Sequence, residues 1–309
     1  MPSRTDRIRG AFWGLLIGDA LGVPYEFHPP EALPPLSAIE FDPPDAFARA
    51  HDEVPPGTWS DDGAQALALL ASLIEQDGLD LDDLGQRLVA WKTSGYMAVD
   101  KKVFDIGIQT QEALKAIEIG VPPAAAGPRH ELANGNGSLM RVLPLALWHV
   151  GSDADLVRDA RAQSRVTHGH PRAQLCCALY CLWARNLLDG TGDWPEAVST
   201  LGALLDPASP DTYELELILT YGKRGGTGYV VDCLHSARLA LKHDTYEDVV
   251  KAAVAIGHDT DTTACVAGGL AGLRTGIEGI PSHWREALRG REIAEPLLAR
   301  LLAREPESV

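Results

Sequence analysis

The sequence predicts an all-α fold. Apolar residues recur at helical spacing through most of the chain, and no segment shows the sustained alternation that is typical of a β-strand. Aromatic residues make up only 6% of the 309 residues, while Ala, Leu and Gly are abundant. Small residues with leucine favour closely packed helices over a β-sandwich, which is enriched in Val, Ile, Thr and Tyr.

The N-terminal quarter of the chain predicts two helices separated by an irregular segment. Residues 7–21 form one apolar helix, which Gly22 closes. Residues 29–57 are rich in proline and acidic residues ("PPEALPPL", "DPPDAF") and cannot sustain a long helix, so we expect an irregular excursion there. Residues 61–76 repeat apolar side chains at helical spacing, and Gly78 follows as a stop signal.

The rest of the chain continues this pattern. Periodicity predicts further helices over residues 82–93, 103–118, 138–149, 153–166, 171–189, 194–204, 211–220, 228–241, 246–256, 262–275, 282–288 and 291–303. The linkers between them are short, no Ser/Gly-rich joint separates two halves, and no internal repeat of convincing period is found. We therefore predict a single domain over residues 1–309.

Charge and cysteine content exclude several functional classes. The formal net charge of -16 repels nucleic acid and anionic membranes. The five cysteines are odd in number, three of them lie in one apolar helical run, and their spacing fits no zinc site, so we expect no disulfide framework. The apolar run Phe12–Ala20 contains Asp19 and is too short to span a bilayer. We expect a cytoplasmic monomer.

One acidic cluster, Ser60-Asp61-Asp62, stands at the predicted start of the helix over residues 61–76. Ser is a good N-cap, and acidic residues in a first turn complement the helix dipole, so a structural interpretation is open. The alternative is a cation site, to which the Ser60 hydroxyl would contribute a further oxygen ligand.

A second acidic cluster, Asp259-Thr260-Asp261-Thr262, lies between apolar segments rich in small residues, so we expect it to be buried. Two carboxylates there would repel each other and lose solvation, which is costly unless something positive compensates. No Lys or Arg lies within the segment. Carboxylate and hydroxyl oxygens suit Mg²⁺ or Mn²⁺ rather than zinc.

Two loops are candidates for ligand contacts. Asn134–Ser138 alternates with glycine and precedes a predicted helix, so its backbone N–H groups can form an anion cradle, although such a loop can also be a plain turn. Thr167–Pro171 separates two predicted helices, and it either forms a helix–helix corner or places an imidazole against a ligand.

Six motifs occur in a fixed order: GLLIGDALGVPYEF, TWSDD, NGNGSLMR, VTHGHP, GTGYVVDCLHSA and GHDTDTTACVAGGLAG. Together they resemble the ADP-ribosylglycohydrolase family, which includes the dinitrogenase reductase-activating glycohydrolases. The resemblance runs from Gly14 to about Gly276, nearly the whole chain. It implies an all-α orthogonal helical bundle with a central cleft that holds two Mg²⁺ (or Mn²⁺) ions.

The resemblance also implies roles for individual residues. By position, the metal ligands are Ser60, Asp61, Asp62, Asp259, Asp261 and Thr262. Glu26 matches the family's glutamate near the metals, and it is our first candidate for the base that activates water, with Asp62 as the second.

The remaining implied contacts are with substrate. The backbone of Asn136, Gly137 and Ser138 matches the pyrophosphate-binding loop. His168 matches a residue on the adenosine-ribose side of the cleft, and Tyr229 lies in a helix-opening motif near the ligand.

The sequence departs from the family pattern at three positions. Ser60 stands where the family usually has threonine before the paired aspartates, and it keeps the hydroxyl. Gly63 replaces the threonine after them and removes a side chain near the site. His258 replaces a common glycine, and its imidazole either tunes the metals or faces outward.

The expected function is hydrolysis at the anomeric carbon of ADP-ribose, releasing it from a modified protein or small molecule. Two alternatives stay open: a catalytically silent, crystallin-like relative, and a dimetal hydrolase of another nucleotide-like substrate. The sequence leaves the linkage open among arginine, serine, an O-acetyl ester and a free ADP-ribosyl metabolite. We expect loops near 29–57 and 95–105 to choose among them.

Overall fold

The computed structural model describes residues 2–304 and confirms the all-α prediction. The helices are α1 (Arg4–Gly22), α2 (Asp61–Gln76), α3 (Leu81–Ser94), α4 (Ile108–Glu118), α5 (Pro123–Ala126), α6 (Leu143–Trp148), α7 (Asp153–Ser164), α8 (Pro171–Asp189), α9 (Trp194–Leu204), α10 (Pro210–Thr220), α11 (Val230–Ala240), α12 (Tyr246–Val254), α13 (Thr260–Thr275), α14 (Ser282–Ala287) and α15 (Arg291–Leu302). Within residues 2–304 no β-sheet forms, and a single antiparallel bridge joins Gly135 to Tyr229. None of the described helices is long and apolar enough to cross a membrane.

Two predicted helix starts are wrong, and one short helix was not predicted. The helix predicted over 103–118 begins at Ile108, because residues 103–107 form no regular structure and Asp105 adopts a left-handed φ of 54°. The helix predicted over 138–149 begins only at Leu143, since tight turns precede it. Helix α5 was not predicted, because four residues are too few for a periodic pattern.

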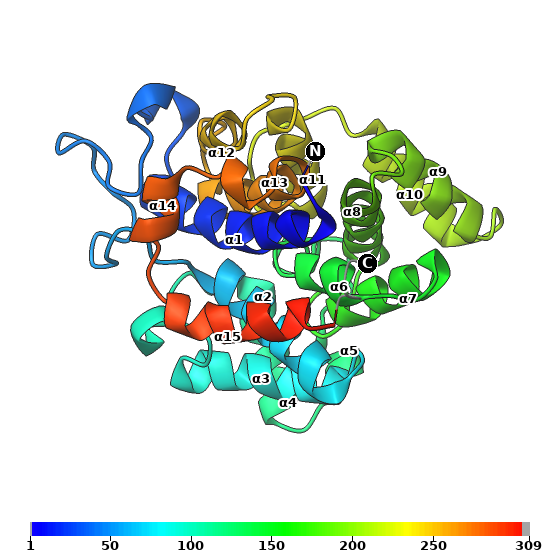
Figure 1. Cartoon of the computed structure of the whole chain (residues 1–309). Coiled ribbons are helices and arrows are strands. Elements are labelled where there is room, and N and C mark those ends of the chain that lie inside the picture. The colour runs from blue at the N-terminus through cyan, green and yellow to red at the C-terminus, as the bar shows by residue number, and fades with distance from the viewer. Residues whose placement is uncertain (1, 305–309) are drawn as a thin grey trace.

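Helices α1 and α13 form the centre of the molecule, where they lie side by side, while α8 crosses the direction of α1 (Figure 1). Glycines at every fourth position of α1 let the two backbones touch. A Cβ on Gly14 would lie 2.5 Å from the Gly268 carbonyl oxygen, and one on Gly22 would lie 2.3 Å from the Asp261 Cα. The C-terminal end of α1 therefore lies against the first turn of α13.

We expect Gly18→Ala to destabilise the protein. Its Cβ would lie 2.2 Å from the Ala264 carbonyl oxygen, and such overpacking typically costs about 1–3 kcal/mol. The matched control is Gly202→Ala in α9, where a Cβ meets nothing within 4 Å. This control is expected to stabilise by about 0.5–1 kcal/mol, the helix preference of alanine over glycine. Urea unfolding of both variants measures the difference, and equal stabilities would contradict the packing argument.

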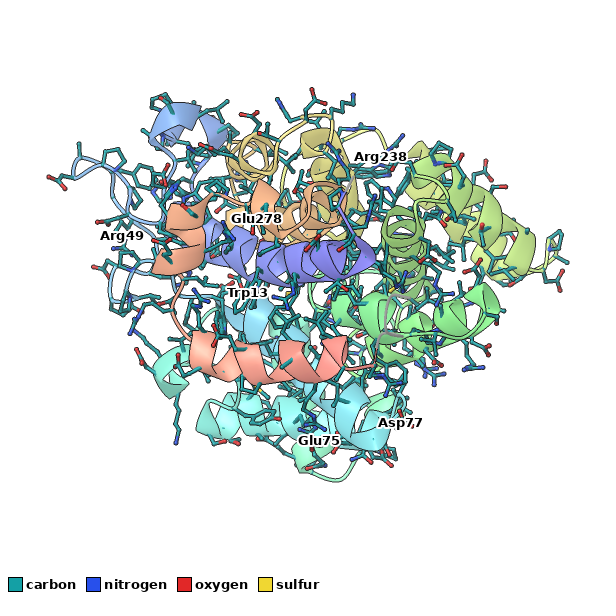
Figure 2. All side chains as sticks on the ribbon, viewed as in Figure 1. Trp13, Arg49, Glu75, Asp77, Arg238 and Glu278 are labelled. Carbon is teal, nitrogen blue, oxygen red and sulfur yellow. The ribbon has the colours of Figure 1, made fainter. Side chains whose placement is uncertain are left out.

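Residues 29–57 contain two single-turn 3-10 helices, Pro30–Ala32 and Leu36–Ala38, and are otherwise irregular. The segment is tied internally and to the end of α1. The Glu40 amide donates to the Tyr25 hydroxyl (2.9 Å), and the Ala50 amide donates to the Pro24 carbonyl (2.9 Å). Arg49, labelled in Figure 2, donates to the Val54 carbonyl (2.8 Å). These contacts hold the end of the segment beside Glu26.

Candidate functional site

A cleft of about 380 Å³ lies where α1, α2 and α13 meet. The sequence-predicted residues that line it are Glu26, Asp61, Asn136, Gly137, His168, Asp259 and Thr262. They come from segments that are far apart in the sequence. Ser60 is the N-cap of α2 and Asp259 the N-cap of α13, so two helix N-termini point their first turns at the same space.

Five carboxylates gather at and beneath the cleft, and all but the partly exposed Asp259 are buried. One oxygen from each of Asp19, Asp62 and Asp261 lies within 4.8 Å of the others, and the same holds for Glu26, Asp259 and Asp261. Asp261 therefore belongs to both groups. No Lys or Arg in the described part of the chain forms an ion pair with any of these five side chains.

This crowding shifts the protonation of the acids. Burial, followed by the charges of Glu26 and neighbouring aspartates, raises the pKa of Asp261 well above its usual range. Burial and nearby acids likewise raise the pKa of Asp62 well above its usual range and that of Glu26 to about 10. Without a compensating positive charge, the cluster cannot hold all of its negative charge at neutral pH.

The donor set fits hard divalent cations. The Oδ2 atoms of Asp62 and Asp261 are buried without any hydrogen-bond partner among the described residues. Unpaired buried carboxylate oxygens are costly, and a cation would satisfy them. The Thr262 hydroxyl lies 3.4 Å from Asp62 Oδ1, and the Ser60 hydroxyl oxygen lies 3.3 Å from the Asp62 amide. Carboxylate and hydroxyl oxygens together match the preference of Mg²⁺ or Mn²⁺.

Asp19 is a site residue that sequence reasoning missed. Its carboxylate accepts from the amides of Ser60 (2.9 Å) and Gly63 (2.7 Å), so it holds the start of α2 in place. Burial raises its pKa to about 7, against the lowering effect of these hydrogen bonds. A lone acid inside an otherwise apolar helix was the available signal, because such a charge is rarely buried without a partner.

The structure explains two of the three departures from the family pattern, Gly63 and His258. A Cβ on Gly63 would lie 2.8 Å from both Leu16 Cδ2 and Trp59 Cγ, so these neighbours fill the volume that a threonine would need. His258 is exposed with a φ of 63°, and only its backbone is engaged, with the His28 carbonyl and the Phe27 amide. Of the two alternatives for His258, the structure therefore has the outward-facing one.

The glycine loop, Asn134–Ser138, is hydrogen-bonded to two other segments of the cleft. The Asn136 amide donates to the Gly228 carbonyl (3.0 Å), and the Asn136 side chain donates to Asp259 Oδ2 (2.8 Å). Ser138 does not line the cleft, because its buried hydroxyl bonds Ser164 (2.8 Å) instead. The backbone of residues 135–137 thus forms one wall of the cleft directly beside the carboxylates.

A buried arginine connects this loop to the acidic floor. The Arg141 guanidinium donates to the Gly137 carbonyl (3.4 Å) and to Gln65 Oε1 (3.1 Å), while the Gln65 amide donates to Asp61 Oδ2 (2.8 Å). Burial lowers the pKa of Arg141 to about 10, which still leaves it charged at neutral pH. Arg141 is therefore a charged group that is linked to Asp61 through Gln65.

His168 and Tyr229 have different surroundings. Burial lowers the pKa of His168 to about 3, so its ring is neutral, and the ring lines the cleft against the glycine loop. Tyr229 does not line the cleft, whereas its neighbour Gly228 does. The Tyr229 hydroxyl accepts from Arg172 (3.3 Å), and its ring packs on Tyr221.

We expect Gly137→Val to weaken ADP-ribose binding. A Cβ at this position would lie 2.9 Å from His168 Cε1 and 3.1 Å from the Thr110 hydroxyl oxygen, so a larger side chain intrudes on the cleft wall. Calorimetry should show a large loss of ADP-ribose affinity, whereas the thermal shift caused by Mn²⁺ persists. Unchanged affinity in a folded variant would exclude this loop from ligand binding.

The segment before α4 and the first turn of α4 contribute cleft residues that were not named from the sequence. Asp105, Gln109 and Thr110 line the cleft. Burial raises the pKa of Asp105 to about 6. Gln109 accepts from the Gly135 amide (2.9 Å), which joins this segment to the glycine loop. Asp105 lies at the edge of the stretch near 95–105 that we expected to choose the linkage, but the prediction of a helix over 103–118 gave no reason to single it out.

Comparisons with known proteins agree with this geometry. A family model described as ADP-ribosylglycohydrolase matches residues 1–308. The chain is 30% identical to an ADP-ribosylarginine hydrolase of Pseudomonas putida, covering 98% of this chain and 79% of the relative. It is also 30% identical to the ADP-ribosyl-[dinitrogen reductase] glycohydrolase of Rhodospirillum rubrum, covering 93% and 92%.

A solved structure described as an ADP-ribosylglycohydrolase-related protein complex superimposes with a TM-score of 0.76 at 32% identity, covering 98% of this chain and 99% of that one. The structural match therefore covers nearly the whole chain. With the family model spanning 1–308, the chain belongs to the ADP-ribosylglycohydrolase family and is a glycohydrolase enzyme.

Proposed function

We propose that this glycohydrolase depends on two divalent cations, Mg²⁺ or Mn²⁺, and removes ADP-ribose from arginine side chains. The observation that carries the metal requirement is the pair of carboxylate groups that share Asp261, with buried, unpaired oxygens on Asp62 and Asp261. Ser60, Asp61, Asp62, Asp259, Asp261 and Thr262 would hold the ions. Bound cations would fix the ribose hydroxyls and lower the pKa of a water molecule.

Other residues of the chain would bind the substrate and transfer the proton. The backbone of Asn136 and Gly137 would receive the pyrophosphate, and the neutral ring of His168 would contact the adenosine-ribose side. Glu26, whose side chain lines the cleft, would take the proton of the attacking water. Negative carboxylates around the anomeric carbon would stabilise the oxocarbenium character that develops as the glycosidic bond breaks.

The arginine linkage is favoured by the charge of the cleft lining and by the relatives. Glu26, Asp61, Asp105 and Asp259 all line the cleft, and no Lys or Arg does so among the described residues. A cationic guanidinium leaving group suits such a lining better than a neutral serine hydroxyl or acetyl ester does. One relative is named for ADP-ribosylarginine, as above.

The carboxylate cluster also bears on the two alternative functions. A crystallin-like silent relative has no need for a carboxylate cluster that destabilises the protein unless cations bind. A dimetal hydrolase of another nucleotide-like substrate would share the cation site, so substrate binding separates it from our proposal.

Location and oligomeric state are separate expectations. The five free, buried thiols agree with the expected reducing, cytoplasmic location. The monomeric state stays a prediction.

The proposal is tested with a panel of ADP-ribosyl conjugates linked through arginine, serine and an O-acetyl ester, each assayed with Mg²⁺, Mn²⁺ or a chelator. We expect release of ADP-ribose from the arginine conjugate, with metal and not with chelator. Full activity in chelator would refute the metal requirement. Faster release from the serine or acetyl conjugate would refute the linkage.

A further inference from the structure

The side chain of Glu26 has one hydrogen-bond partner among the described residues, and that partner is His51. Glu26 Oε2 lies 2.7 Å from His51 Nε2, and Glu26 is only 4% exposed. No motif of the family resemblance contains His51, which lies near the end of the irregular segment 29–57.

The His51 ring is held firmly in place. It packs between Phe27, at 5.6 Å between ring centroids, and Phe104, at 5.1 Å. Its backbone adopts a left-handed φ of 49°, which is costly for a residue with a side chain, and the Val54 amide donates to its carbonyl (2.8 Å). The adjacent Ala50 amide anchors the segment to the Pro24 carbonyl. The orientation of the imidazole is therefore determined by its surroundings.

Glu26 needs such a partner because of its location. It follows the 3-10 helix Val23–Tyr25 at the end of α1, and one of its oxygens lies within 4.8 Å of carboxylate oxygens of Asp259 and Asp261. Repulsion would turn a mobile glutamate away from these groups. A donor at Oε2 fixes the carboxylate beside them and leaves Oε1 available to accept a proton.

We propose that His51 is a positioning residue that holds the carboxylate of Glu26, through an Nε2–H···Oε2 hydrogen bond, in the orientation required to accept the proton of the attacking water. This inference rests on the function proposed above. It also gives the irregular segment 29–57 a role, since the contacts of that segment hold His51 against Glu26.

Two substitutions separate positioning from packing. His51→Phe keeps a ring between Phe27 and Phe104 but removes the donor, whereas His51→Gln offers a side-chain amide N–H for the same acceptor. We expect His51→Phe to slow single-turnover hydrolysis about 10- to 100-fold, the size of losing one hydrogen bond to a charged group. His51→Gln should recover most of this loss. The affinity for ADP-ribose and the Mn²⁺-induced thermal shift should stay unchanged in both.

A double-mutant cycle with Glu26→Gln tests whether His51 acts through Glu26. Adding His51→Phe to Glu26→Gln should cost nothing further, because the group being positioned is already disabled. His243→Phe, at an exposed histidine of the loop after α11, controls for the substitution itself. Additive losses would overturn the inference, as would wild-type or faster turnover of His51→Phe while the wild type still hydrolyses the conjugate. A wild type that hydrolyses no conjugate with either metal would refute the proposed function instead.

Discussion

Asp261→Ala is expected to abolish hydrolysis and to remove the rise in melting temperature that Mg²⁺ or Mn²⁺ gives the wild type. Asp261 contributes an oxygen to both carboxylate groups, and its Oδ2 has no partner within the described residues. Asp61→Ala should behave alike, since Asp61 lines the cleft at the start of α2. Each variant would remove one of the proposed metal ligands.

Without metal, the melting temperature of the Asp261→Ala variant should not fall. Carboxylates that repel one another destabilise the folded protein, so the metal-free Asp261→Ala variant should melt no lower than the metal-free wild type, apart from the lost bond to the Thr262 amide. Asp261→Asn keeps an acceptor for that amide and isolates the charge. In the wild type, stabilisation should grow with metal concentration, reaching about 2.7 kcal/mol at 100 times the Kd.

Differential scanning fluorimetry across a metal titration, beside activity, measures both effects. Asp82→Ala is the matched control, because Asp82 is also an acid in the first turn of a helix but is exposed. It should leave the metal-induced shift and the activity unchanged. Equal metal-induced shifts in the wild type, Asp61→Ala and Asp261→Ala would exclude these acids as ligands.

Local sequence patterns predicted most helices, because each buries a periodic apolar face that can be recognised within a few turns. They failed where tertiary contacts override the pattern. Residues 103–107 carry apolar side chains but form no helix, and Asp105, with a φ of 54°, lines the cleft instead. The glycine loop ends in tight turns rather than helix, with the Gly137 carbonyl accepting from Arg141.

In the candidate site, too, local patterns could be recognised in the sequence but tertiary contacts could not. The Asp259–Thr262 cluster was visible because paired acids between apolar segments rich in small residues are unusual, and Ser60–Asp62 was visible through its adjacent acids at a predicted helix start. Their convergence depends on the packing of α1 against α13, which no local pattern reveals, although glycine at every fourth position of α1 was a readable sign of close helix contact. Asp19 and His51 were missed because each acts through a residue distant in sequence. The substrate contact of Tyr229 stays a prediction, with its hydroxyl beside Arg172.

Glu26→Gln is the second large expected effect. The substitution keeps the size of the side chain and an acceptor oxygen for His51, but it removes the capacity to take a proton. Single-turnover hydrolysis should fall by about 10²–10⁴-fold, the usual contribution of general acid–base catalysis. ADP-ribose should still bind, because the loop at Asn136 and Gly137 and the ring of His168 belong to other walls of the cleft.

The informative measurement pairs hydrolysis with binding on one protein preparation. If Glu26→Gln keeps the Mn²⁺-induced thermal shift and ADP-ribose affinity while losing turnover, Glu26 handles the proton. Near-normal turnover would remove Glu26 from the mechanism and transfer the role to Asp62, which lies 1% exposed beneath the cleft with an unpaired Oδ2. Loss of the thermal shift along with activity would instead make Glu26 a metal ligand, an outcome that its oxygen within 4.8 Å of Asp259 and Asp261 allows. We expect the first result, because the bond to His51 already engages one oxygen of Glu26 and directs the side chain from outside the carboxylate cluster.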